Sequence, residues 1–284
     1  MIGHCMRHSR LRSPLARAGC LALLLVLWPH PGDAPGGHLH AQVSVVGQLE
    51  TRSYHFEPTG EEMEYALFVP GAHDGDSELP LVVLLHGLGS TPGQVMRYEG
   101  ILEEAEARGY LVVAPMGYNR RGWYGSVGPG REARLGARPE DPENLGELSE
   151  LDVMNVLERT LEGFPVDRDR IFLMGHSMGG GGTLHLAMTY PDIWAGLAPV
   201  APAIYSDPTE GARAIRHLSV ILLQGTDDDL VPVTIARAWA EAMAELDMNV
   251  RYIEVEGGDH TAIISRTPRH VQAIFDFFDG IETP

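Results

Sequence analysis

A serine, an aspartate and a histidine occur in this sequence in settings that suit nucleophilic catalysis. Ser177 lies in residues 175–179, Gly-His-Ser-Met-Gly, directly after a short apolar run. This pattern is typical of a tight turn between a strand and a helix, which exposes one serine hydroxyl over the end of a sheet. Because a serine hydroxyl is a weak nucleophile, it needs a base to take its proton and an acid to orient that base. We predict that Ser177 is the nucleophile and that its partners lie downstream.

Candidate partners follow in the order acid, then base. His260 comes just after the last predicted strand, behind a Gly-Gly-Asp turn, and is the predicted general base. The acid lies in a run of three aspartates after another predicted strand. We predict Asp228, because the segment then reads Gly-x-x-Asp-x-x-Val-Pro, while Asp227 and Asp229 remain alternatives. Serine, acid and histidine form one of the chain orders in which catalytic triads occur.

A tetrahedral acyl-transfer intermediate carries an oxyanion, which needs backbone N–H donors. The first predicted donor is Met178, the residue after the nucleophile. The second is Leu88, in the segment His-Gly-Leu-Gly that follows an upstream apolar run. His86 heads that loop, and we expect it to fix the loop's shape and to border the substrate site.

Residues 117–147 form a long segment rich in glycine, proline and arginine, without a clear period. A loop of this length inside a domain is usually functional or disordered. It leaves the carboxyl end of a predicted strand, where open α/β sheets bind ligands. Trp123 and Tyr124 are therefore candidate walls of a substrate pocket. The alternative is that both rings only anchor the loop to the core.

The elements that must position these residues alternate between short apolar runs and longer helical ones. This alternation predicts an α/β fold, a mostly parallel, doubly wound sheet of about eight strands flanked by helices, with an antiparallel start. Ser149, with Asp152 three residues on, fits a helix N-cap. The predicted strands are residues 43–49, 63–69, 81–86, 110–115, 170–175, 196–200, 220–225 and 250–255, and the predicted helices are 93–108, 149–164, 178–190, 233–246 and 268–278.

The first residues have the composition of a secretory signal peptide. Four arginines precede an apolar run at residues 20–28, and small residues follow it. We expect residues 1–41 to hold this signal and a short N-terminal segment, with cleavage after Ala34 or Ala41. Residues 42–284 are then one α/β domain that is secreted or periplasmic. The apolar run is shorter than the roughly 20 residues of a transmembrane helix, so we expect no membrane span in the mature form.

Composition excludes several kinds of chemistry. The net charge of −18 argues against nucleic acid as a partner. The only cysteines, Cys5 and Cys20, lie in the predicted signal, and the sequence has no lysine. The mature chain therefore has no disulfide, thiolate nucleophile or Schiff-base lysine. No metal-binding pattern occurs, so we expect neither a metal nor another cofactor.

Four segments together resemble the secreted α/β-hydrolase serine esterases. The resemblance is to the polyhydroxybutyrate depolymerase-like and feruloyl esterase-like groups and to the catalytic domain of the prolyl oligopeptidase family, over about residues 60 to 280. It implies an α/β-hydrolase fold and acyl transfer through an acyl-serine. Many such depolymerases have a cysteine where His176 stands here. The four segments are Leu-Leu-His-Gly ending at Gly87, Gly-His-Ser-Met-Gly-Gly ending at Gly180, Gly-Thr-Asp-Asp-Asp-Leu-Val-Pro ending at Pro232 and Gly-Gly-Asp-His ending at His260.

The predicted function is therefore hydrolysis of carboxylic esters, with a small-molecule or oligomeric substrate: a short acyl ester, an aryl (feruloyl-type) ester or an oligomeric polyester. The alternative is a prolyl oligopeptidase-like serine peptidase that lacks a propeller, since too few residues precede the hydrolase core to form one. Acyltransfer and thioester hydrolysis are further candidates. A binding module without activity would leave the complete Ser–Asp–His set unexplained. The oligomeric state stays open.

Overall fold

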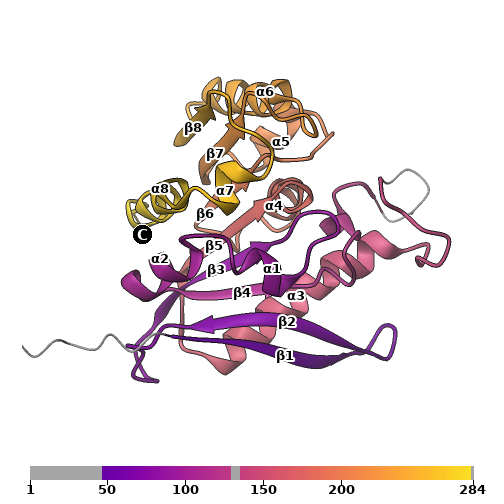
Figure 1. The fold of residues 1–284 in the computed structure, drawn as a ribbon, viewed down its shortest axis with the longest axis vertical. Helices are drawn as coiled ribbons and strands as arrows, with labels where there is room; N and C mark the ends of the chain where they lie inside the picture. Colours follow the sequence, from indigo (N-terminus) through magenta and orange to yellow (C-terminus); the bar gives the residue numbers. More distant parts are fainter. Residues whose placement is uncertain (1–46, 129–134, 283–284) are drawn as a thin grey trace, which may run out of the picture. The chain divides into compact units, whose positions relative to one another are not determined.

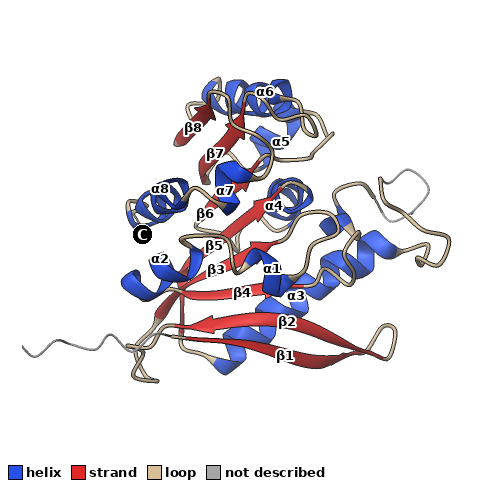
Figure 2. Cartoon of the chain, in the orientation of Figure 1, coloured by secondary structure: helices blue, strands red, loops and turns tan. Residues whose placement is uncertain are grey.

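The computed structural model of the chain describes residues 47–128 and 135–282. The predicted signal peptide and most of the predicted strand at residues 43–49 lie outside the described residues. The described residues form one eight-stranded sheet with helices on both faces (Figures 1 and 2). The strands are β1 (Gln48–Phe56), β2 (Glu61–Val69), β3 (Leu79–Leu85), β4 (Leu111–Pro115), β5 (Val166–His176), β6 (Gly196–Val200), β7 (Ser219–Gly225) and β8 (Val250–Val255).

The sheet has the order β1-β2-β4-β3-β5-β6-β7-β8. β1 pairs antiparallel with β2, and β2 with β4, whereas every other neighbouring pair is parallel. The central strand β3 is buried at every residue, as expected for a strand with helices on both faces. The structure thus confirms the predicted α/β fold with an antiparallel start.

The first strand differs from the prediction. β1 runs over Gln48–Phe56, and the prediction of residues 43–49 included only its first two residues. β1 is an edge strand of polar sequence, and only Tyr54 and Phe56 are buried. A strand with one partner needs few apolar residues, so hydropathy alone does not reveal it.

The helices divide between the two faces of the sheet. Buried residues of α3, α4, α5 and α6 pack on one face, and those of α1, α2, α7 and α8 on the other. Among the described residues, no helix has the length and hydropathy needed to cross a lipid bilayer. The bounds are α1 (Pro92–Val95), α2 (Ile101–Arg108), η1 (Trp123–Gly125), α3 (Leu145–Gly163), α4 (Met178–Thr189), α5 (Pro208–Ala214), α6 (Val233–Ala244), α7 (Ala262–Ser265) and α8 (Pro268–Asp279), where η1 is a 3-10 turn.

Three helix predictions need correction. The predicted helix at residues 93–108 is split into α1 and α2, because Gly100 has a φ of 96°. The short helices α5 and α7 were not predicted. Ser149 is not an N-cap, since α3 begins four residues earlier, at Leu145. Its hydroxyl instead accepts a hydrogen bond from Tyr124 N at 3.0 Å, and Asp152 accepts one from Gly117 N at 2.7 Å. Both side chains therefore hold the loop that follows β4.

Candidate active site

Ser177 occupies the turn between β5 and α4 in a strained conformation. Its φ of 59° and ψ of −116° are unusual for a residue other than glycine. The strain is held in place by backbone hydrogen bonds: Ser177 N donates to Val200 O at 2.8 Å, and Ser177 O accepts from Ala203 N at 3.0 Å. Strain held by its surroundings in this way is common at functional sites.

The structure brings the three predicted catalytic side chains together. His260 Nε2 lies 2.8 Å from Ser177 Oγ, and His260 Nδ1 lies 2.7 Å from Asp228 Oδ2. His260 and Asp228 are each 9% exposed. Asp227 and Asp229 are exposed. Of the three consecutive aspartates, the structure therefore brings Asp228 to the histidine.

Asp228 is held by four hydrogen-bond donors. Oδ1 accepts from Leu230 N at 2.9 Å and Val231 N at 2.8 Å, and Oδ2 accepts from His260 Nδ1 and from Gln224 Nε2, the latter at 2.8 Å. Burial favours the neutral acid, but hydrogen bonds from Val231, His260 and Leu230 outweigh it and lower the pKa of Asp228. The carboxylate is thus ionised and fixed in position.

Gln224 belongs to the site but was not predicted. It lies in β7, is fully buried and binds Asp228 through its amide nitrogen. Its sequence signal is a single polar residue at the end of an apolar strand, four residues before the acid.

His176 contacts His260, the predicted general base. Its Nε2 lies 2.8 Å from His260 O, and its Nδ1 lies 2.9 Å from Tyr98 OH. Burial, with a smaller effect from His260, lowers the pKa of His176 to about 4. A neutral ring with the proton on Nε2 satisfies both contacts, because Tyr98 then donates to Nδ1 and His176 donates to the His260 carbonyl.

The predicted oxyanion donors lie at the two segments that flank Ser177. Neither Met178 N nor Leu88 N donates to another backbone group of the described residues. A Cβ placed on Gly87 would lie 3.4 Å from Ser177 Cβ, so the loop that carries Leu88 passes close to the nucleophile. Two free N–H groups near one serine hydroxyl are what an oxyanion hole requires.

The three predicted substrate-binding side chains divide into two groups. Trp123 lines the cavity at Ser177 and is 3% exposed. Tyr124 and His86 are fully buried and do not line that cavity. Tyr124 OH donates to His86 O at 3.1 Å and accepts from His86 N at 3.0 Å. Tyr124 therefore anchors its own loop to the core, as the alternative interpretation had it for this ring, and is not a wall of the pocket.

The His86 ring also holds the loop after β3 through two contacts with backbone carbonyl oxygens. Its Nδ1 and Nε2 each lie 2.8 Å from a carbonyl oxygen, of Gly87 and Met116 respectively. Burial lowers the pKa of His86, although the two carbonyl oxygens favour the protonated ring. The expectation that His86 fixes the loop agrees with these contacts, whereas a direct contact with substrate does not agree with its burial.

The cavity at Ser177 has a volume of about 380 Å³. It opens at the carboxyl ends of β3, β5, β6 and β7, where open α/β sheets bind ligands. Its wall contains Leu88, Tyr98, Trp123, Tyr205, Leu230 and Val231 beside the serine and His260.

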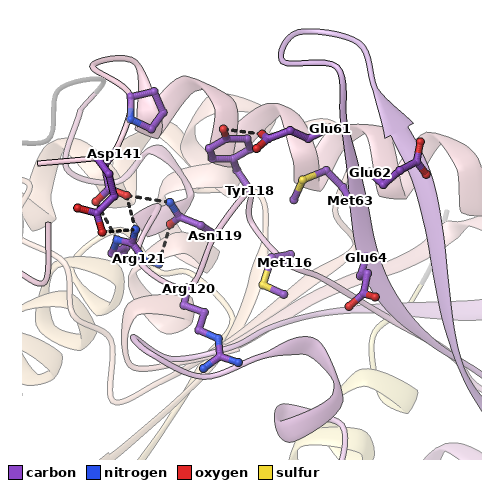
Figure 3. A pocket seen from close by; sticks show the side chains of 12 residues that line it. Glu61, Glu62, Met63, Glu64, Met116, Tyr118, Asn119, Arg120, Arg121 and Asp141 are labelled. Carbon is purple, nitrogen blue, oxygen red and sulfur yellow. Dashed lines mark hydrogen bonds and ion pairs between the residues drawn. The ribbon is translucent and has the colours of Figure 1, made fainter. Parts of the chain in front are cut away.

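A second hollow lies between β2 and the loop after β4 (Figure 3). It has a volume of about 520 Å³ and is lined by charged residues. Arg121 pairs there with Asp141 at 2.6 Å, and Tyr118 OH donates to Glu61 at 2.7 Å. Among the described residues, its lining has no serine, cysteine or histidine, and so no pair like Ser177 and His260. Among the described residues, no cluster of side chains could hold a metal ion.

Fold and site together define a class of protein. A mostly parallel eight-stranded sheet with a serine on the turn after β5, the strand beside β3 in the middle of the sheet, is the architecture of the α/β-hydrolases. Residues 57–262 match the model of the family described as "Putative esterase", so the chain belongs to this family of ester hydrolases.

Similar proteins agree with this assignment. The chain is 32% identical over 242 residues to "Putative esterase NocK" of Nocardia uniformis subsp. tsuyamanensis, covering 82% of this chain and 67% of that protein. It is 25% identical to S-formylglutathione hydrolase of Paracoccus denitrificans, over 72% of this chain and 84% of the relative. The solved ferulic acid esterase of Anaeromyces mucronatus shares the fold, with a TM-score of 0.64 at 18% identity over 84% of this chain and 92% of the other.

Proposed function

We propose that Ser177, His260 and Asp228 form a catalytic triad that hydrolyses carboxylic esters. Ser177 Oγ attacks the carbonyl carbon of the ester while His260 Nε2 takes the hydroxyl proton. Asp228 holds the ring through Nδ1 and stabilises its positive charge. The observation that carries this proposal is the continuous chain of hydrogen bonds from Ser177 Oγ through His260 to Asp228, at 2.8 and 2.7 Å.

The tetrahedral intermediate places a negative charge on the former carbonyl oxygen. The N–H groups of Met178 and Leu88 are the proposed donors to this oxyanion. When the intermediate collapses, the C–O bond to the alcohol breaks and His260 gives its proton to the leaving alcohol. A water molecule then attacks the acyl-serine with His260 as base, which releases the acid and restores Ser177.

The proposed substrates are short acyl, aryl or oligomeric esters. Trp123 is the proposed aromatic wall, since it lines the cavity beside Ser177. Relatives of this chain include S-formylglutathione hydrolase, and a structural neighbour is a ferulic acid esterase. Each of these names contributes one candidate substrate to the test.

The test compares turnover by the wild-type protein and by Ser177→Ala. The panel holds p-nitrophenyl acetate, butyrate and octanoate, methyl ferulate, S-formylglutathione and a proline anilide peptide. We expect ester turnover that falls by about 10⁴-fold or more in Ser177→Ala, with little anilide cleavage. Anilide cleavage as fast as ester cleavage would instead favour the peptidase alternative, and full turnover by Ser177→Ala would refute the triad.

We further propose that the protein is exported by its N-terminal segment. The support is the sequence pattern alone: basic residues, an apolar run and small residues before Ala34 and Ala41. Mass spectrometry of the protein expressed with its own N-terminus tests this. A mature chain that begins at Pro35 or Gln42 is expected, and an intact N-terminus on the cytoplasmic side would contradict the proposal.

A further inference from the structure

Large apolar side chains that face solvent gather at the mouth of the Ser177 cavity. Among the described residues, four large hydrophobic side chains are exposed, and three of them line this cavity. They are Leu135, Tyr205 and Leu230, with exposed fractions of 71%, 67% and 71%. We call these three residues the apolar rim. The fourth, Leu151 in α3, is 39% exposed and does not line this cavity.

The rim is built from separate segments of the chain. Leu135 comes from the loop between β4 and α3, Tyr205 follows β6, and Leu230 follows β7. Single exposed apolar residues are ordinary on a protein surface, but several that converge on one opening indicate a binding surface. Because Leu88, Trp123 and Val231 continue the apolar lining inward, rim and cavity form one surface that ends at Ser177.

The same surface is poor in charge. None of the described residues that line the cavity is an arginine, lysine, aspartate or glutamate. The charged residues next to lining residues in the sequence are of both signs: Asp229 and Asp259 are acidic and exposed, and Tyr98 lies between Arg97 and Glu99, which are both exposed. Arg134, which precedes Leu135, lies outside the described residues. A ligand with carboxylates would therefore find no cation among the described lining residues.

The charge of the cavity lining can be compared with the charge of a relative's substrate. One relative is an S-formylglutathione hydrolase, and glutathione carries two carboxylates. The charge of the described lining does not suit such a leaving group. An uncharged ester, in contrast, enters the cavity without the free-energy cost of removing water from a charged group. Its apolar part is also stabilised by contact with the rim.

We propose that the rim and cavity together select uncharged esters whose apolar part is longer than the cavity, so that it lies against Tyr205 and Leu230 outside. This inference rests on the proposed esterase function of Ser177. Burial of one methylene favours binding by about fourfold. Partial burial of several methylenes on the rim therefore predicts that kcat/KM rises about 10- to 100-fold from the shortest to the longest ester.

The test measures the ratio of kcat/KM for long and short esters in the wild-type protein, Tyr205→Ser, Leu230→Ser and the double variant. One series runs from p-nitrophenyl acetate to octanoate, and a second from ethyl acetate to octyl acetate, so that either side of the ester can meet the rim. We expect the ratio to fall about threefold or more in each single variant, and further in the double variant. Leu151→Ser is the matched control and should keep the wild-type ratio.

A charge test completes the experiment. S-formylglutathione is compared with its diethyl ester, which has the same thioester without the two carboxylates. We expect the diethyl ester to have a kcat/KM about tenfold higher. Higher turnover of the free acid would overturn the proposal.

The outcomes separate this inference from the proposed function. Turnover that depends on Ser177 but has equal long-to-short ratios in the wild-type protein and the rim variants would overturn the inference alone. A wild-type dimer that becomes monomeric in the double variant, with unchanged ratios, would assign the rim to a second copy and also overturn it. Turnover that survives Ser177→Ala would overturn both proposals.

Discussion

Asp228, the proposed acid of the triad, shows how contacts with neighbouring groups distinguish one residue from others of the same type. Three consecutive carboxylates have the same chemistry, but only Asp228 meets both the histidine and two backbone N–H groups. These bonds lower its pKa despite burial. Its negative charge keeps the proton of the neutral imidazole on Nδ1, so that Nε2 is free to accept the serine proton.

Asp228→Asn is expected to lower kcat by about 10³- to 10⁴-fold, because an amide nitrogen can donate to Nδ1 and stabilise the wrong tautomer. Steady-state kinetics with p-nitrophenyl butyrate measures this loss. Asp227→Asn removes a neighbouring exposed carboxylate and serves as the matched control. Equal losses in the two variants would contradict the assignment of Asp228.

His176 gives a stability prediction with a defined sign. Its pKa falls from 6.5 to about 4 in the folded protein, mainly because it is buried. Between pH 6.5 and pH 4 the unfolded chain therefore binds more protons at this residue, and stability falls as the pH falls through this window. The unfolding free energy lost as the pH falls through this window is about 3 kcal/mol.

His176→Gln should remove that contribution. Urea unfolding at several pH values between 4 and 7 would then show a shallower loss of unfolding free energy than in the wild-type protein. The same pH slope in both proteins would mean that His176 does not carry the effect.

Some residues of the site could be predicted from the sequence, and others could not. Ser177, Asp228 and His260 were chosen because each follows a predicted strand in a distinctive segment, and the structure brings them within hydrogen-bonding distance. Gln224 has only a weak local signal, a polar residue at the end of an apolar strand. Tyr98 has none, since its contact with His176 spans 78 positions of the chain. The sequence also does not reveal which of the adjacent residues Trp123 and Tyr124 lines the cavity at Ser177.

At the scale of elements, the helix α4 packs unusually closely against the backbone of the sheet and its loops. A Cβ on Gly179 would lie 2.3 Å from Leu85 O, and one on Gly181 would lie 2.1 Å from Ala203 O. The four consecutive glycines at residues 179–182 therefore allow the close packing of α4 beside Ser177. The approach also matters for Ser177, whose carbonyl accepts a hydrogen bond from Ala203 N.

Gly181→Ala is expected to destabilise the fold by about 3 kcal/mol or more, since the new methyl group would overlap a backbone carbonyl. Gly163→Ala, at the end of α3, is the matched control, because a Cβ there meets nothing within 4 Å. Its stability should change by at most about 1 kcal/mol. Urea unfolding measures the stability of both variants. Equal unfolding midpoints would contradict the packing argument.

Element boundaries were less predictable than element order. Alternating apolar runs gave the parallel sheet, because buried strands must be apolar whatever the loops do. The break between α1 and α2 depends on the positive φ of Gly100, and β1 depends on pairing with β2. Pairing with a neighbouring strand is not contained in a local pattern, and glycine adopts positive and negative φ about equally, so its presence alone does not mark the break.

At the scale of the molecule, the net charge of −18 sets the electric field that a substrate meets. The field should repel anionic esters at low ionic strength and leave neutral esters unaffected. Added salt screens it over about 10 Å at 0.1 M.

We therefore expect kcat/KM for mono-p-nitrophenyl succinate to rise about two- to fivefold between about 20 and 300 mM NaCl. The value for p-nitrophenyl butyrate, which is neutral and of the same acyl length, should stay constant. A decrease for the succinate ester would indicate a cationic site that the net charge conceals.

The central claim is that an acyl group passes through Ser177. The most direct measurement is the intact mass of the protein, quenched with acid within milliseconds of mixing with p-nitrophenyl butyrate, followed by peptide mapping. We predict a mass increase of one butyryl group on the peptide that contains Ser177, and none in Ser177→Ala. Acylation of another residue during turnover, or undiminished turnover by Ser177→Ala without any acylated protein, would contradict the account.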